Sequence, residues 1–305
     1  MKKSTGKKRI TLLIGYLLII VGISLPLASL TSMSWRQLRA EMKFKHYVEA
    51  SSSAEVDPLI ERRIEEYNQM IQTGPIDYVD PFRMRDYKTD YNISDDPDAI
   101  FAYIHAPKLD LYQPIRLGAD QDHLAIGAAH VDGTALPVGG KSNRSVIAGH
   151  RSTQRETFFY NIDELEPGDR VYIYRQRTKL TYLVTGQEEV DYTDWSKLDP
   201  VEGEDLLTLL TCIPFGLAPE RRLLVHARRL ETEVTTDNDK ISEPSESFET
   251  NDIQEMTDLA QDEPTVDEAS QEVASSVKLL NNAIYAATLI GYALIIAIIV
   301  KAIRN

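Results

Sequence analysis

Three kinds of side chain in this sequence are placed where a chain could use them for chemistry. Cys212, the single cysteine among 305 residues, follows an apolar run from Leu206 to Thr211. His150 follows a second short apolar run, and Arg221 and Arg222 begin a third. A thiolate nucleophile, an imidazole acid or base, and a guanidinium that donates to an oxyanion together make a thiol transferase. The same cysteine is also compatible with a buried group that packs as a small apolar residue.

Composition excludes several other classes of protein. One cysteine cannot form an intrachain disulfide. The net charge of −14 is concentrated in residues 231–272, where 15 Asp or Glu residues stand against one Lys, a local −14. The rest of the chain is therefore near neutral and has no basic patch with interleaved aromatic residues, so we expect no nucleic-acid partner. No nucleotide-binding glycine motif and no CxxC or HExxH motif is present, so we expect no cofactor and no metal.

Two apolar runs are long enough to cross a membrane. Ile10 to Leu30 follows a cluster of basic residues, and basic residues also follow Ala283 to Val300. We predict a transmembrane anchor in residues 1–33 and a transmembrane helix in residues 277–305. The positive-inside rule then places both termini in the cytoplasm and the rest outside the cell. A cleaved signal peptide is the alternative for the first run.

The region between these two apolar runs divides into segments with different sequence patterns. Apolar residues at three- and four-residue spacing predict helix over 34–73, with Asp57-Pro58 as a start signal. A long aperiodic loop follows, and loops of this length often act as lids, so we treat 34–99 as a helical and lid segment.

The remaining part contains a β-rich domain and a linker. Short β-like runs separated by Gly- and Pro-containing turns over 100–230 indicate a mainly β barrel or sandwich with short helices. Residues 231–276 are acidic and poor in large apolar groups, which is typical of a disordered linker.

Specific motifs in the β-rich domain resemble those of sortases. The stretch from Ala129 to Gly140, followed by Ser145 to Arg151, resembles the sortase histidine region. Leu209 to Gly216, followed by Arg222 to Val225, resembles the T-L-x-T-C motif and its downstream arginine. The resemblance implies a closed β-barrel of the sortase type.

The resemblance also implies site residues. Cys212 would be the nucleophile, His150 the acid and base, and Arg222 the oxyanion donor. Arg221 is the alternative arginine, because the turn after Cys212 is one residue longer than usual; we favour Arg222 because strand alignment fixes the side-chain face.

A further motif points to the class. Asp80-Pro81-Phe82 in the long loop resembles the lid of class C, pilus-assembling sortases. In that class, Phe82 would cover the sulfur, and Asp80 would pair with Cys212 or Arg222. His130 lies in the stretch that resembles the sortase histidine region, and we expect it to be structural or to support a neighbouring site residue.

A class C sortase would cleave a Leu-Pro-x-Thr-Gly-like C-terminal sorting signal through a thioacyl intermediate. It would then join the pilin subunit to a lysine of another pilin by an isopeptide bond. The partners implied are pilin subunits and the membrane. The alternatives are a housekeeping sortase that anchors proteins to the cell wall and a non-catalytic membrane-tethered adhesion or scaffold module.

Overall fold

The computed structural model describes residues 3–53, 55–74, 78, 80–83, 92–151, 159–214, 220–230 and 273–304. The α-helices are α1 (Lys3–Ser52), α2 (Pro58–Thr73), α3 (Gln121–Ile126) and α5 (Ser275–Arg304). Single 3-10 turns are η1 (Pro107–Leu109), η2 (Ile162–Glu164) and η3 (Ser196–Leu198). The strands are β1 (Ala102–Ala106), β2 (Leu111–Leu117), β3 (Ala128–His130), β4 (Asn143–Ala148), β5 (Arg170–Arg175), β6 (Thr178–Asp191), β7 (Asp205–Ile213) and β8 (Arg221–Arg229).

The strands form one closed barrel in the order β1-β2-β3-β4-β7-β8-β6-β5, with β5 pairing back to β1. Most neighbours are antiparallel, but β2 with β3 and β4 with β7 are parallel. The closed β-barrel that the motifs implied is therefore confirmed, and the sandwich left open by strand spacing alone is wrong. Closure removes the exposed strand edges that a sandwich must protect.

Two apolar cores lie on the two faces of the barrel wall. All eight strands contribute to the larger core, which therefore fills the interior. The smaller core lies on the other face of β4, β7 and β8, with Ala148, Leu210 and Leu224 among its members. Strands buried on both faces carry continuous apolar runs, and this explains why β7 does not alternate between apolar and polar residues. The smaller core is the one on which the functional residues lie.

Helix α2 begins where the sequence predicted. Asp57 is its N-cap, and the carboxylate accepts a hydrogen bond of 2.9 Å from the amide of Leu59, while Pro58 occupies the first helical position. Asn68, on the buried face of α2, accepts a hydrogen bond of 2.8 Å from the amide of Leu136. The helix is thereby attached to the barrel, and the chain that follows it leads toward the smaller core.

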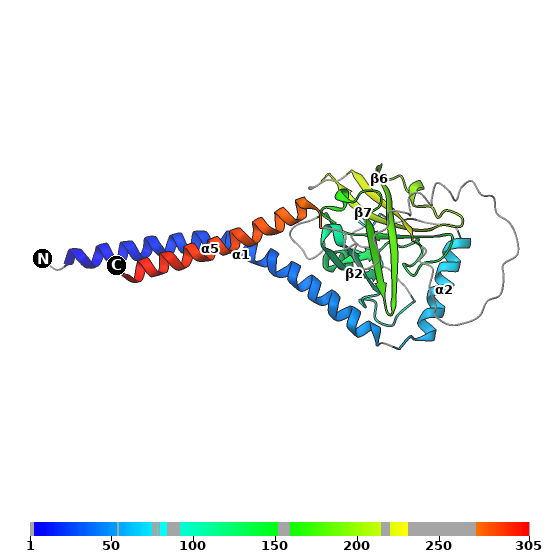
Figure 1. The fold of residues 1–305 in the computed structure, drawn as a ribbon, viewed down its shortest axis with the longest axis horizontal. Coiled ribbons are helices and arrows are strands. Elements are labelled where there is room, and N and C mark those ends of the chain that lie inside the picture. The colour runs from blue at the N-terminus through cyan, green and yellow to red at the C-terminus, as the bar shows by residue number, and fades with distance from the viewer. Residues whose placement is uncertain are drawn as a thin grey trace, which may run out of the picture.

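Within the part of the chain that the structure describes, two helices are long and apolar enough to cross a membrane, at Thr11–Ser32 and Ser275–Ile303. Helix α1 and helix α5 run side by side away from the barrel, and both chain ends lie at the same end of the molecule (Figure 1). A Cβ on Gly291 would lie 2.6 Å from Leu27, so glycine permits this close approach.

The described ends of these helices bear on the predicted domain limits. Helix α5 begins at Ser275 and so includes the last two residues of the range predicted for the acidic linker. Most of that predicted linker, residues 231–272, lies outside the described residues, as do 84–91 of the long loop. The domain limits and the membrane orientation stay predictions.

Candidate active site

Strands β7 and β8 place a thiol and a guanidinium side by side. Cys212 is directly opposite Arg222 in the antiparallel register, and directly opposed residues share one face of a sheet. The side chain of Arg222 is fully buried and that of Cys212 is partly buried. Arg221 is opposite Ile213 instead, and its exposed guanidinium forms an ion pair of 2.6 Å with Glu189. Arg222 is therefore the arginine beside the thiol, although the catalytic role of either arginine is still a prediction.

His150 comes from the strand on the other side of β7. Strands β4 and β7 are parallel with Ala148 opposite Leu210, so continuing the register by two residues brings His150 level with Cys212. Two hydrogen bonds extend the pairing beyond β4. The amide of Gly149 donates to the carbonyl of Leu210 at 3.1 Å, and the hydroxyl of Thr211 donates to the carbonyl of Gly149 at 2.7 Å. The histidine is thus held at the strand end where the thiol lies.

Residue 149 must be small for the histidine to have this place. A Cβ built on Gly149 would lie 2.8 Å from the ring of Phe159, closer than real contacts allow. The amide of Phe159 in turn donates to the carbonyl of His150 at 3.2 Å. Phe159 therefore packs under the turn that carries His150, and any larger residue at 149 would push the two apart.

The three predicted lid residues lie over this site. Asp80 accepts a hydrogen bond of 2.6 Å from Nη2 of Arg222, and the two side chains are 10% and 1% exposed. The other carboxylate oxygen of Asp80 accepts from the amide of Phe82 at 3.0 Å, which fixes the turn. The ring of Phe82 lies 5.6 Å from the ring of His150 and 5.4 Å from the guanidinium carbon of Arg222. Asp80 thus pairs with Arg222. The ring of Phe82 lies against the side chains of His150 and Arg222, two of the predicted catalytic residues.

The described residues around the lid include contacts that sequence reasoning missed. The side-chain amide of Gln121 in α3 donates to the carbonyl of Pro81 at 2.8 Å. Tyr78 packs at 6.5 Å from Trp195 and donates to Asp199 at 3.2 Å. These contacts hold the lid turn, at Pro81, and the preceding Tyr78 onto the barrel. Nothing in the sequence around these residues signals them, because each joins segments far apart along the chain.

Burial keeps the thiol protonated in this arrangement. Burial is the main cause that raises the pKa of Cys212 to about 12, against the positive charge of Arg222, which lowers it, and the carboxylate of Asp80 makes a smaller contribution that raises it. A thiolate is the nucleophilic form. In this arrangement Cys212 is therefore in the thiol form, which is not nucleophilic.

His130 has a structural environment. It is fully buried, and its Nε2 lies 2.9 Å from the carbonyl oxygen of Ala135 and 3.0 Å from the hydroxyl of Thr134. Burial lowers the pKa of His130 to about 4, so the ring is neutral at neutral pH. Its hydrogen bonds tie the loop after β3 to the barrel, as expected of a structural histidine.

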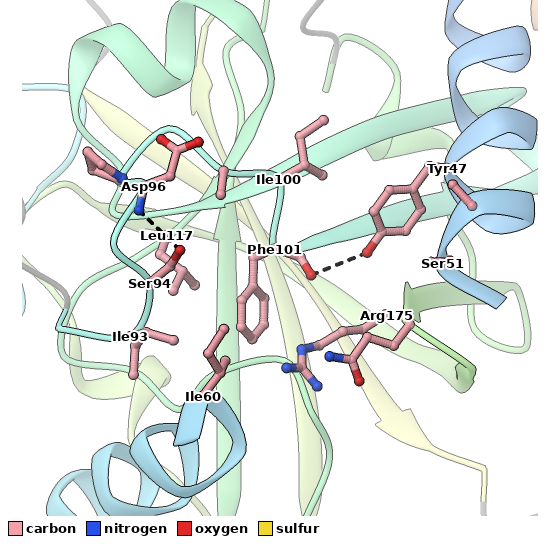
Figure 2. Close-up of a pocket in the computed structure, with 14 residues that line it drawn as sticks. Tyr47, Ser51, Ile60, Ile93, Ser94, Asp96, Ile100, Phe101, Leu117 and Arg175 are labelled. Carbon is pink, nitrogen blue, oxygen red and sulfur yellow. Dashed lines mark hydrogen bonds between the residues drawn. The ribbon is translucent and has the colours of Figure 1, made fainter. Parts of the chain in front are cut away.

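A separate cavity of about 400 Å³ lies between α1, α2 and the start of β1 (Figure 2). Its lining is mainly apolar, with Ile60, Ile93 and Phe101 among its residues. The hydroxyl of Tyr47 donates to the carbonyl of Phe101 at 3.3 Å across one side of this cavity (Figure 2). None of Cys212, His150 and Arg222 lines it. The cavity is therefore distinct from the candidate active site.

Comparison with known proteins agrees with this geometry. The model of the sortase domain matches residues 104–230. The chain is 31% identical over 122 residues to sortase A of Bacillus anthracis, a match that covers 40% of this chain and 56% of that protein. The chain spans about half the length of the curated relatives it matches.

Solved structures match over a larger share of their length. Sortase C-3 of Streptococcus pneumoniae is 35% identical with a TM-score of 0.55, and the match covers 64% of this chain and 90% of that one. Sortase C of the same organism, whose reported structure addresses pilin substrate specificity, is 29% identical with a TM-score of 0.55, covering 63% and 97%. A barrel of this topology, with a cysteine and an arginine paired across its last two strands and a domain model that spans them, places this chain in the sortase family.

Proposed function

We propose that this protein is a class C sortase, a cysteine transpeptidase that cleaves a Leu-Pro-x-Thr-Gly-like sorting signal and joins the resulting acyl group to a lysine of another pilin. The observation that carries the proposal is the strand register, which pairs Cys212 with Arg222 and, continued two residues beyond β4, brings His150 level with Cys212. A nucleophile, a proton carrier and an anion donor so aligned are what acyl transfer through a thioester requires.

In the first half-reaction, with the lid open, the thiol proton of Cys212 passes to His150, and the thiolate attacks the carbonyl carbon of the threonine in the sorting signal. The negative charge moves onto the carbonyl oxygen, where Arg222 donates hydrogen bonds. The carbon–nitrogen bond then breaks, and protonated His150 gives its proton to the departing glycine amine. The product is a thioester on Cys212.

In the second half-reaction, the amine of an acceptor lysine attacks the thioester carbonyl. Neutral His150 removes the proton from this amine, and Arg222 again stabilises the oxyanion. The carbon–sulfur bond breaks and returns Cys212 as a thiolate beside protonated His150. The isopeptide bond forms without any cofactor.

The lid contacts favour class C over a housekeeping sortase. The ion pair between Asp80 and Arg222 takes the guanidinium away from its proposed role, and Phe82 covers His150. A lid that occupies the site in this way must open before a substrate can enter, which fits an enzyme that acts on a protein substrate. The second apolar helix and the likeness to sortases C of Streptococcus pneumoniae support the same reading. In this proposal the barrel lies outside the cell and both termini lie in the cytoplasm.

The test uses the full chain in detergent micelles with a Leu-Pro-x-Thr-Gly donor peptide and a lysine-containing acceptor peptide. Mass spectrometry should detect an isopeptide-linked product with the wild type and none with Cys212→Ala. A parallel reaction contains a cell-wall precursor amine in place of the lysine peptide. Transfer to the precursor alone would support the housekeeping alternative, and absence of any thioester or transfer would support the scaffold alternative.

A further inference from the structure

The residue that follows the lid motif makes a contact that the proposed reaction does not use. The guanidinium carbon of Arg83 lies 3.4 Å from the centroid of the Tyr192 ring. A cation over an aromatic face at this distance is attracted by the ring quadrupole. Arg83 is exposed, so its guanidinium could instead extend into water. Its placement on the ring therefore identifies the face of Tyr192 as a surface that binds a cation.

Tyr192 lies on the same face of the barrel as the candidate active site. It directly follows β6, and its amide donates to the carbonyl of Glu220 at 3.3 Å, which continues the β6–β8 register by one pair. Val190, two residues earlier, is opposite Arg222. Because side chains alternate along a strand, Tyr192 points to the same side as Val190, Arg222 and Cys212.

The register also gives the distance from the thiol. Cys212 and Val190 are separated by two strand spacings of about 4.8 Å each, and Tyr192 lies two residues of about 3.3 Å further along. The cation-binding face is therefore roughly 12 Å from Cys212. A reacting amine cannot be bound there, but a basic residue three or four positions away along an extended peptide can reach it.

We propose that the ring face of Tyr192 forms a subsite for a basic side chain of the acceptor protein, which Arg83 fills when the lid is closed. The inference rests on the proposed transpeptidase function. The acceptor is favoured over the donor because the proposed sorting signal has no basic residue at its fixed positions, whereas the acceptor presents a lysine-bearing segment. Acceptor binding and lid closure then compete for one site.

The experiment compares two acceptor peptides with the full chain in detergent micelles and saturating Leu-Pro-x-Thr-Gly donor. Both peptides contain one lysine; one has arginine three residues from it and the other has glutamine there. The measured quantity is the ratio of the two KM values for transfer, glutamine peptide over arginine peptide. A cation–π contact at a solvent-accessible site predicts a ratio of about two to five for the wild type.

Variants test which residues cause the preference for the arginine peptide. The ratio should fall to about one in Tyr192→Leu. It should increase in Arg83→Gln, because the competing cation is removed. The matched control is Tyr172→Leu, which removes a different tyrosine–cation contact, that with Lys179 at 4.2 Å. This control should keep the wild-type ratio.

Each outcome decides one point. A wild-type ratio of one, or a raised ratio that survives in Tyr192→Leu, overturns the subsite. A preference that appears only when the arginine is moved into the donor peptide overturns the assignment to the acceptor. The intact mass of the enzyme with donor alone is recorded in the same samples. Absence of a thioester there refutes the proposed function itself, whereas a thioester with a ratio of one refutes only this inference.

Discussion

Replacing Asp80 by asparagine is predicted to make the thiol of Cys212 more reactive. In the closed lid the Asp80 carboxylate contacts the Arg222 guanidinium at 2.6 Å, and both side chains are nearly buried. The carboxylate also contributes, after burial, to a pKa of about 12 for Cys212. Asp80→Asn removes the negative charge and weakens the contact that holds the lid turn on the barrel.

The size of the effect follows from these contacts. A hydrogen bond between charged groups contributes about 1.5 to 3 kcal/mol, and about 1.4 kcal/mol changes an equilibrium constant tenfold. The open fraction of the lid should therefore rise about ten- to a hundredfold. At pH 7.5 a thiol with a pKa near 12 is almost wholly protonated, whereas an exposed cysteine with a pKa of about 8.5 has roughly a tenth of its thiol ionised. Alkylation should therefore pass through the open state and follow its population.

The assay is the rate of iodoacetamide alkylation of the full chain in detergent, followed by intact mass. Asp80→Asn should react about ten- to a hundredfold faster than the wild type at pH 7.5. The matched control is Asp169→Asn, which weakens the similarly buried ion pair of Asp169 with Lys108 at 2.7 Å and should leave the rate unchanged. An unchanged or slower rate in Asp80→Asn would refute the idea that this ion pair keeps the thiol protected.

Three further predictions concern the same framework. The pKa of His130 is about 4 in the folded protein and about 6.5 in the unfolded chain, so the unfolded chain binds a proton first as pH falls. Up to about 3 kcal/mol of stability should therefore be lost between pH 6.5 and 4. Urea unfolding at several pH values should show this loss, and His130→Asn should make the stability less dependent on pH. Thr211→Val leaves the buried carbonyl of Gly149 without its donor and should cost about 1 to 3 kcal/mol in urea unfolding, whereas Thr211→Ser should cost less. Arg222→Lys should lower kcat for peptide transfer by about a hundredfold or more, whereas Arg221→Lys should have a much smaller effect; equal losses would contradict the assignment made from the strand register.

Much of the barrel could be predicted because its long strands are buried on one or both faces. The runs in β5, β6 and β7 were recognised from apolar residues and flanking turns, and each lies within the observed strand. Strand β3 could not be predicted from its own residues, because three residues carry no periodicity. Its place is set by pairing with β2 and β4, which are distant contacts that propensity does not report.

The residues of the candidate site also divide into those that the sequence predicts and those that it does not. Motifs indicated Cys212 and His150, and strand alignment favoured Arg222, which the register places opposite Cys212. The contact of Arg83 with Tyr192 could not be anticipated, because it joins two loops and depends on how the lid turn lies on the barrel. Local motifs thus report the ends of strands well, but they do not report contacts between loops.

In the proposed reaction, Cys212 forms a thioester with the acyl part of a sorting signal. This thioester can be detected from the intact mass of the full chain after brief reaction with a Leu-Pro-x-Thr-Gly peptide and acid quenching, followed by peptide mapping. We expect an added mass equal to the acyl part of the peptide, located on Cys212, absent in Cys212→Ala and discharged by hydroxylamine. An adduct on another residue, or no adduct even in Asp80→Asn, would contradict the proposed reaction.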